Sequence, residues 1–267
     1  KGINVSLVLQ NLGMESTALG FSAGFTGREI ESALKDWGCF TEFIRIPQGL
    51  SRINLKLRSN EESEINGQGP EISKEALEAL YQKLDAMQPE DVLVLAGSIP
   101  SSMPDSSYEQ IMARVQNKNV RTVVDATGNL LVNVLKYHPF LIKPNNHELE
   151  EIFKVPMDSR DTIVAHAKKL QEMGAENVLI SMAGDGAILV SADGEVYSSE
   201  APKGKVVNSV GAGDSMVAGF ITGYLRSHSY ETAFHMGICT GSASAFSERL
   251  ATQEEVDHIL KQMNWTA

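Results

Sequence analysis

The chain has 267 residues and a mass of 29.0 kDa, and its 42% hydrophobic residues are enough to bury a core, which excludes a mainly disordered chain. It carries 23 Lys and Arg against 34 Asp and Glu, a formal net charge of −11, which argues against a protein that binds the phosphate backbone of nucleic acids. No His or Cys spacing matches a zinc site, and no apolar run approaches the roughly 20 residues of a membrane-spanning helix, so we expect a cytoplasmic protein without nucleic-acid or membrane partners.

The first part of the chain contains a helix-like start, followed later by a segment of alternating residues. From residue 40 to 67, three short extended pieces succeed one another with alternating apolar and polar residues and no helix between them. This alternation predicts a small sheet with one face packed against the protein and one face exposed to solvent. We expect a single domain over residues 1–267, with an insertion at about 40–67 that stands off it as a lid or contact surface.

Beyond this segment, apolar runs of strand length alternate with amphipathic helical patterns. The strand-like runs are residues 91–98, 121–128, 139–145 and 177–184. The clearest helices are 73–87, opening on Ser73, and 161–174, closing on Gly174. The alternation predicts an α/β fold with a parallel sheet covered by helices, followed by helices at 211–227, 230–248 and 252–263.

The segment 207–220 is the most informative for chemistry, because Gly211-Ala212-Gly213 precedes Asp214 at the start of a predicted helix. Free backbone N–H groups at a helix start favour an anion such as a phosphoryl group. The same donors would keep the Asp214 carboxylate ionised beside that anion, where a base for a substrate hydroxyl must lie. The short Gly-Ala-Gly-Asp pattern alone is weak evidence for an active site, since Asp214 could simply cap the helix. The sequence contains neither a P-loop nor a dinucleotide-binding fingerprint.

The wider stretch NSVGAGDSMVAGF (208–220) resembles the signature of the ribokinase-like sugar kinases, the PfkB family, and other motifs follow in the family's order. KGINVS (1–6) is similar to the end of the family's sugar-binding segment, and LAGSIP (95–100) is similar to its strand-end motif. KPNNHELE (143–150) is similar to its Asn-x-x-Glu motif, and SMAGDGA (181–187) is similar to its nucleotide loop. The resemblance covers essentially the whole chain. It implies a ribokinase-like three-layer fold, with a mostly parallel central sheet flanked by helices and a small β-sheet lid.

The resemblance also implies roles for the residues around the transferred phosphoryl group. Asp214 would take the proton from the acceptor hydroxyl, while Gly211, Ala212 and Gly213 would present amides to the phosphoryl group. Glu148 would hold Mg²⁺ through water; alternatively, it is a solvated acid in the first turn of a helix. The nucleotide would contact Asn145, Gly213 and the loop formed by Ser181, Met182, Ala183, Gly184, Asp185 and Gly186, a loop that is also a plain turn between strands.

The phosphate of the substrate needs cations in this acidic chain. The candidates beside the matched motifs are Lys1, Arg52, Lys56 and Lys143, and Arg52 is the first choice because a guanidinium binds phosphate bidentately. For Arg52 and Lys56 the alternative is charge that protects an edge strand from pairing. Gly2, Asn4, Ser98 and Asp125 would contact the sugar at strand or helix ends, although Asp125 could instead cap a turn.

Two departures from the family pattern stand out. Many members have Asp-Thr where this chain has Asn208-Ser209, which removes a charge near the metal and keeps a hydroxyl. The family also has a stretch before this Lys-Gly-x-Asn motif, with the first strand and an Asp that binds the sugar. We expect this part to be missing, with apolar surface of the sheet left exposed.

Within the family, SRINLKL (51–57) and EINGQGPEIS (64–73) are most similar to the 1-phosphofructokinase branch, with tagatose-6-phosphate kinases as near relatives. We therefore expect phosphorylation of fructose 1-phosphate to fructose 1,6-bisphosphate with ATP and Mg²⁺. Tagatose 6-phosphate and fructose 6-phosphate are the alternative acceptors, and a non-catalytic sugar-phosphate binder or fragment is the alternative outside the enzymes. We further expect the 40–67 lid to close over the sugar and to pair with its copy in a homodimer.

Overall fold

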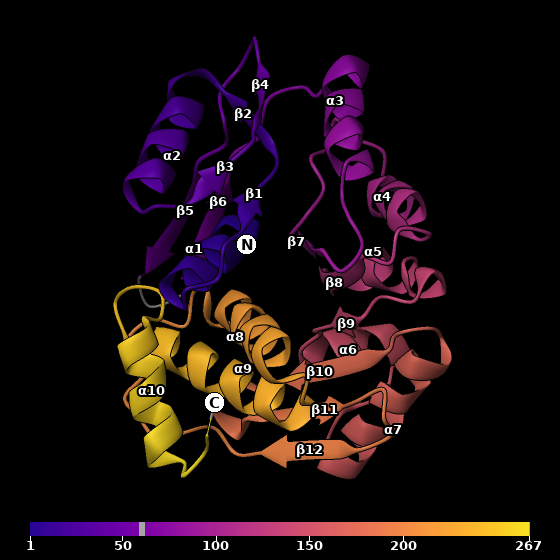
Figure 1. The fold of residues 1–267 in the computed structure, drawn as a ribbon, viewed down its shortest axis with the longest axis vertical. Helices are drawn as coiled ribbons and strands as arrows, with labels where there is room; N and C mark the ends of the chain where they lie inside the picture. The colour runs from indigo at the N-terminus through magenta and orange to yellow at the C-terminus, as the bar shows by residue number, and fades with distance from the viewer. Residues whose placement is uncertain (59–61, 267) are drawn as a thin grey trace.

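A six-stranded sheet organises the larger part of the molecule in the computed structural model, which describes residues 1–58 and 62–266 (Figure 1). Its order is β12-β11-β10-β9-β8-β7. The parallel strands are β7 (Val92–Ala96), β8 (Arg121–Asp125), β9 (Leu141–Ile142) and β10 (Asn177–Ser181), and β11 (Ala187–Val190) and β12 (Val196–Ser199) continue the sheet antiparallel. The predicted, mostly parallel sheet is confirmed.

Helices cover both faces of this sheet, because successive side chains of a strand point to opposite faces. One core joins Val124, Ile142 and Ile180 to one set of helices, and a second core joins their neighbours Val123, Leu141 and Leu179 to another. The first set comprises α3 (Lys74–Asp85), α4 (Ser107–Val115), α5 (Gly128–Val132), α6 (Asn146–Phe153) and α7 (Arg160–Glu172). The second comprises α1 (Gly2–Asn11), α8 (Ala212–Ser227), α9 (Tyr230–Phe246) and α10 (Gln253–Gln262). The result is the expected three-layer ribokinase-like arrangement.

The strands at residues 17–66 form a separate group at one end of the molecule (Figure 1). β1 (Thr17–Ala18) pairs with β3 (Phe40–Thr41), and β2 (Phe21–Ala23) pairs with β4 (Ile44–Ile46), both parallel. β5 (Asn54–Arg58) and β6 (Glu62–Asn66) form an antiparallel pair. We call residues 17–58 and 62–66 the β segment.

The β segment differs from the small sheet expected within 40–67, because β3 and β4 pair with strands that precede residue 40. Parallel neighbours need a crossover connection, and here α2 (Gly24–Asp36) supplies it between β2 and β4. The stretch 17–23 is short and interrupted by Gly20, so its sequence carries little strand signal.

Glycines allow α8 and α9 to pack closely in the second core. A Cβ at Gly219 would lie 2.4 Å from the Thr240 Oγ1 and 2.5 Å from the Met236 carbonyl oxygen. A Cβ at Gly223 would lie 2.8 Å from the Ala233 Cα. These approaches fix the axis of α8, whose first turn contains Gly213 and Asp214.

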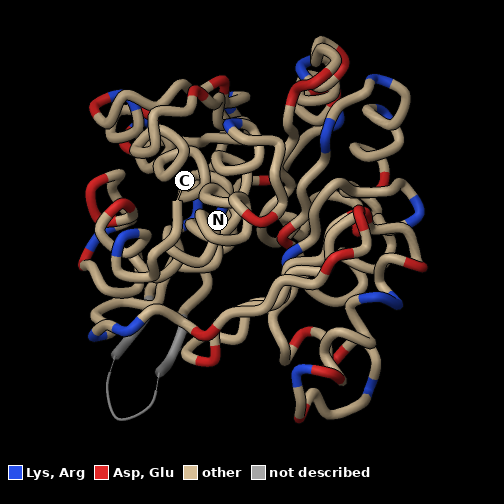
Figure 2. Tube along the Cα trace, turned by 60° about the horizontal axis from the view of Figure 1, so that its bottom comes forward, with Lys and Arg blue, Asp and Glu red and all other residues tan. Residues whose placement is uncertain are grey.

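Acidic and basic residues are interspersed along the Cα trace in Figure 2, in a chain with 34 Asp and Glu against 23 Lys and Arg. Among the described helices, none is both long enough and apolar enough to cross a bilayer.

Candidate active site

The carboxyl ends of the parallel strands meet the amino ends of α1 and α8 at one edge of the sheet, where ligands of open α/β sheets bind. Asp125 ends β8, Lys143 follows β9, and Asn145 forms a parallel bridge with Ser181 at the end of β10. The sequence-predicted residues after these strands are therefore brought together.

A buried carboxylate links three of these elements. Lys1 Nζ lies 3.2 Å and Lys143 Nζ 3.4 Å from Asp125 Oδ1, and the Asp125 side chain is 2% exposed. Its second oxygen, Oδ2, is buried and has no hydrogen-bond partner among the described residues. Because a buried acceptor without a partner is unfavourable, this oxygen fits a group that donates a hydrogen bond, such as a sugar hydroxyl.

Asp214 lies in the first turn of α8 and is buried. Its Oδ2 accepts a hydrogen bond of 2.8 Å from the Asn4 side chain, so the starts of α1 and α8 are joined directly. Gly2 opens α1 beside open space. The carboxylate that the sequence singled out as a base is thus fixed in orientation by Asn4, another predicted site residue.

The turn before Asp214 offers free backbone N–H groups that could bind an anion, except at Ala212; we call this turn the anion cradle. Gly211 has a φ of +85°, and a Cβ there would lie 2.8 Å from Leu250 Cδ2, so a side chain would be strained. The N–H groups of Gly213 and Asp214 have no acceptor within the described part of the chain. The Ala212 N–H instead donates to the Ser209 carbonyl at 3.2 Å, so this amide, which we had expected in the cradle, is already engaged.

Lys143 connects this cradle to the buried carboxylate. Its Nζ lies 3.2 Å from the position that a Cβ on Gly213 would take, and its side chain is almost fully buried. An ammonium there faces the free amides at the helix start, where a phosphoryl group would carry negative charge.

Asn145 and Glu148 form a capping box at the start of α6. The Asn145 Oδ1 accepts from the Glu148 N–H at 2.7 Å, and the Glu148 Oε2 accepts from the Asn145 N–H at 2.8 Å. No cluster of three His, Cys, Asp or Glu side chains that could hold a metal occurs in the described residues. A single carboxylate still fits Mg²⁺, because this ion keeps several waters and takes other ligands from substrate phosphates.

The predicted nucleotide loop forms a short turn between β10 and β11, η2 (Ala183–Asp185). Gly186 ends it with a φ of +91°, where a Cβ would lie 2.0 Å from the Ser199 carbonyl oxygen. Arg160 donates to the Asp185 carbonyl at 2.6 Å and holds the loop from α7. Ala183, Gly184 and Asp185 are exposed and Met182 is buried, and no pattern in the sequence had pointed to Arg160.

Ser98 lies at the end of β7 and is exposed, beside a tyrosine that the sequence analysis missed. The Tyr108 hydroxyl donates to the Gly97 carbonyl at 3.0 Å. Burial, together with the nearby Asp125 charge, raises the pKa of Tyr108 to about 12, so the hydroxyl keeps its proton. It lies in the amphipathic α4, where a tyrosine gives no functional signal.

Arg52 and Lys56 belong to the β segment, and no contact within the described residues joins them to this cluster. Arg52 is exposed and follows Ser51, whose Oγ accepts from the Ala23 N–H at 3.0 Å. Lys56 lies in β5 opposite Glu64, and its side chain is outside the described ones.

A family model described as "pfkB family carbohydrate kinase" matches residues 1–256, which include every element of this cluster. The chain belongs to the pfkB family of carbohydrate kinases. As a member it is a phosphotransferase with an alcohol group as acceptor, and the expected family and fold are confirmed.

This pfkB-family chain is similar to named relatives over nearly its whole length. It is 47% identical to 1-phosphofructokinase of Bacillus subtilis over 266 residues, 100% of this chain and 87% of that protein. It is 36% identical to D-tagatose-1-phosphate kinase of Bacillus licheniformis over 267 residues, with the same shares of both chains.

Solved structures of this family superpose closely on the chain. Phosphofructokinase-2 of Escherichia coli in complex with substrates and products gives a TM-score of 0.92 at 25% identity, covering 98% of this chain and 87% of that chain. Ribokinase of Arabidopsis thaliana gives 0.79 at 21% identity, covering 97% and 86%, which shows the same fold.

Proposed function

We propose that this kinase transfers the γ-phosphoryl group of ATP to fructose 1-phosphate, giving fructose 1,6-bisphosphate. The observation that carries the proposal is the buried Asp214 carboxylate beside the free N–H groups of Gly213 and Asp214. The names of the relatives favour a 1-phosphate acceptor, because they are 1-phosphofructokinases and a D-tagatose-1-phosphate kinase. The 6-phosphates are less favoured, and so is a non-catalytic binder.

Asp214 acts in this proposal as the general base. Its carboxylate accepts the proton of the acceptor hydroxyl as that oxygen attacks the phosphoryl group. The amides of Gly213 and Asp214, together with the Lys143 ammonium, stabilise the negative charge on the transferred oxygens. The Asn4 hydrogen bond keeps the carboxylate aligned, since a small misplacement of a base lowers the rate steeply.

The sugar phosphate lies between the sheet edge and the β segment. The unpartnered Asp125 Oδ2 accepts from a sugar hydroxyl, and Asn4, Gly2 and Ser98 border the same space. Lys1 and Arg52 supply charge for the phosphate already on the substrate, with Arg52 delivered from the β segment acting as a lid. Lys56 is a further candidate from the same segment.

The nucleotide lies along the loop of residues 181–186, with Asn145 and Gly213 at its phosphates. Glu148 is the residue that would hold Mg²⁺, through its Oε1 or a bound water. A Mg²⁺ ion held there would neutralise charge on the nucleotide phosphates.

Exposed apolar side chains of the β segment support a homodimer. Ile53, Leu55 and Ile65 are 67%, 49% and 59% exposed, and Leu55 and Ile65 are cross-strand partners. A cluster of exposed apolar residues typically marks an interaction surface. We propose that two copies pair through this face.

The proposed acceptor predicts a ranked series in an assay of ADP release by the purified protein. The kcat/KM for fructose 1-phosphate should exceed that for fructose 6-phosphate and tagatose 6-phosphate by about a hundredfold or more, because a misplaced phosphate leaves buried polar groups unpaired. Tagatose 1-phosphate tests the second relative's substrate. Equal rates with the 6-phosphates would refute the 1-phosphate assignment, and no ADP above background with any sugar phosphate would refute the kinase.

Asp214→Asn should lower kcat by about 10²–10⁴-fold, because a positioned base contributes a factor of this size, while the nucleotide Kd changes little. Asparagine keeps the shape of the side chain, and its amide oxygen can still accept the hydrogen bond from the Asn4 side chain. Asp161→Asn, an exposed acid in the first turn of α7, is the control and should leave kcat unchanged. An undiminished kcat in Asp214→Asn would rule out the base.

Glu148→Gln separates the two roles of this residue, since glutamine also completes a capping box. The melting temperature should stay constant, while the Mg²⁺ concentration for half-maximal activity rises about tenfold. Glu151→Gln, an exposed change on the same helix, should have neither effect. If the Mg²⁺ requirement of Glu148→Gln equals that of the wild type, Glu148 is only a cap.

Sedimentation equilibrium should give twice the 29.0 kDa chain mass for the wild type. The double change Ile53→Asp and Ile65→Asp should give the single-chain mass, because it places charge in the proposed contact. Val196→Asp, at a partly exposed apolar residue of β12, is the control and should remain a dimer. A wild-type monomer, or a dimer in the double variant, contradicts the proposal.

A further inference from the structure

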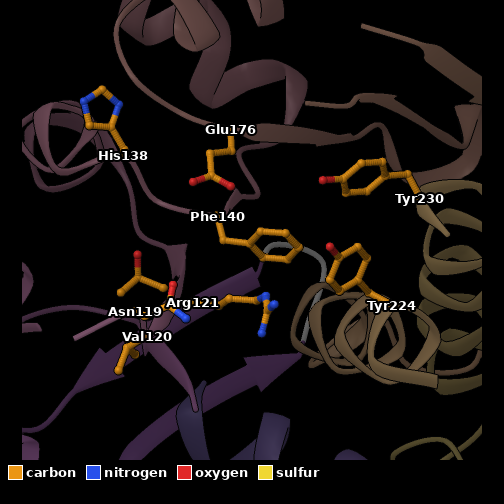
Figure 3. Close-up of a pocket in the computed structure, with 9 residues that line it drawn as sticks. Asn119, Val120, Arg121, His138, Phe140, Glu176, Tyr224 and Tyr230 are labelled. Carbon is orange, nitrogen blue, oxygen red and sulfur yellow. The ribbon is translucent and has the colours of Figure 1, made fainter. Parts of the chain in front are cut away.

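A pocket of about 290 Å³ opens at the amino ends of β8, β9 and β10, at the edge of the sheet opposite to the candidate active site (Figure 3). The turns before these strands form one side, and the end of α8 and the start of α9 form the other. Its size is near the lower limit of small-molecule sites. Nothing in the proposed reaction uses it.

Glu176 is the only carboxylate that lines this pocket, and it has no salt bridge in the described part of the chain. Burial raises the pKa of Glu176, and the nearby charges of His138 and Arg121 lower it by less. In Figure 3 its carboxylate points toward the space above the Phe140 ring, as does the Tyr230 hydroxyl. The Glu176 side chain is exposed at the mouth of the pocket, so its carboxylate is available to a ligand.

The cation that lines the pocket is already neutralised. Arg121 Nη2 lies 2.6 Å from Glu90 Oε2, and this hydrogen bond lowers the pKa of Glu90. Asn119 donates its side-chain N–H to the same Glu90 carboxylate, which leaves the amide oxygen of Asn119 as an acceptor. Each residue thus has a donor on Glu90, and the Arg121 guanidinium carbon lies 6.0 Å from the centre of the Tyr224 ring.

His138 is tied to the backbone of the turn before β10. Its Nδ1 lies 3.1 Å from the Gly174 carbonyl oxygen, which can only accept, so Nδ1 carries a proton and donates to that oxygen. The carboxyl end of α8, with its partial negative charge, closes the pocket at Tyr224. Because the Arg121 charge is paired with Glu90 and Glu176 has no salt bridge among the described residues, these three side chains leave one net negative charge at this wall.

Aromatic rings provide the remaining wall. The Phe140 and Tyr224 ring centroids lie 4.8 Å apart, and Tyr224 stacks on Tyr230 at 5.3 Å. Such rings favour a cation or an aromatic group beside them. A carboxylate, neutral acceptors and aromatic rings in one pocket together match an organic cation.

We propose that this pocket binds a small organic ammonium ion, whose N–H groups donate to the Glu176 carboxylate and whose apolar part contacts Phe140 and Tyr224. The proposal is independent of the kinase substrate, because no residue of the candidate active site lines the pocket.

Benzylammonium chloride is a suitable probe, with benzyl alcohol as its uncharged analogue. Titration followed by NMR or calorimetry should give one saturable site with a Kd on the order of 1 mM for benzylammonium, typical of so small a ligand. Benzyl alcohol should bind about tenfold more weakly or not at all. Absence of saturable binding of the cation, or equal binding of the alcohol, would overturn the proposal.

Glu176→Gln should weaken benzylammonium binding about tenfold, to the level of the alcohol. The backbone hydrogen bonds of Glu176, to Pro139 and from Gln171, do not involve its carboxylate, so the melting temperature and the kinase activity should be retained. Glu172→Gln, an exposed acid of α7 outside the pocket, should bind the probe as the wild type does. Equal affinity in Glu176→Gln and Glu172→Gln would refute the role of Glu176.

Discussion

The candidate site depends on one buried ion cluster, in which the Asp125 carboxylate forms ion pairs with both Lys1 and Lys143. Burying a charge without a partner costs several kcal/mol, so these groups hold the start of α1, the end of β8 and the residue after β9 in one arrangement. One carboxylate and two ammonium groups leave a net positive charge. In a chain with a net charge of −11, that local surplus suits the anionic substrate that we propose for this edge of the sheet.

The second constraint acts through α8. Gly219 and Gly223 let α9 pack closely against α8, and this packing positions the first turn of α8, which carries Gly213 and Asp214. A rigid helix start suits phosphoryl transfer, where the protein contributes mainly position and electrostatic stabilisation. The last turn of the same helix contributes Tyr224 to the pocket at the opposite edge of the sheet.

The features that sequence predicted well are those that local pattern specifies. The apolar runs that became β7, β8 and β10 and the Ser73 cap of α3 depend on neighbouring residues, and the motif around Asp214 is specific to its family. The pairing of β3 and β4 with β1 and β2 was missed, because partners in a sheet are set by non-local contacts. Tyr108 and Arg160 were missed for a related reason, since each acts through a backbone carbonyl that is distant in sequence.

The orphaned Oδ2 of Asp125 has a consequence for selectivity among sugars. A buried acceptor without a hydrogen-bond partner costs about 1–3 kcal/mol, so a ligand that donates to this oxygen stabilises the folded protein. A ligand that places a hydroxyl there relieves that penalty, whereas a deoxy analogue of the same shape would keep it. If the proposed contact of Asp125 with the sugar holds, the site therefore disfavours the analogue through the protein's own unmet hydrogen bond, without any steric clash.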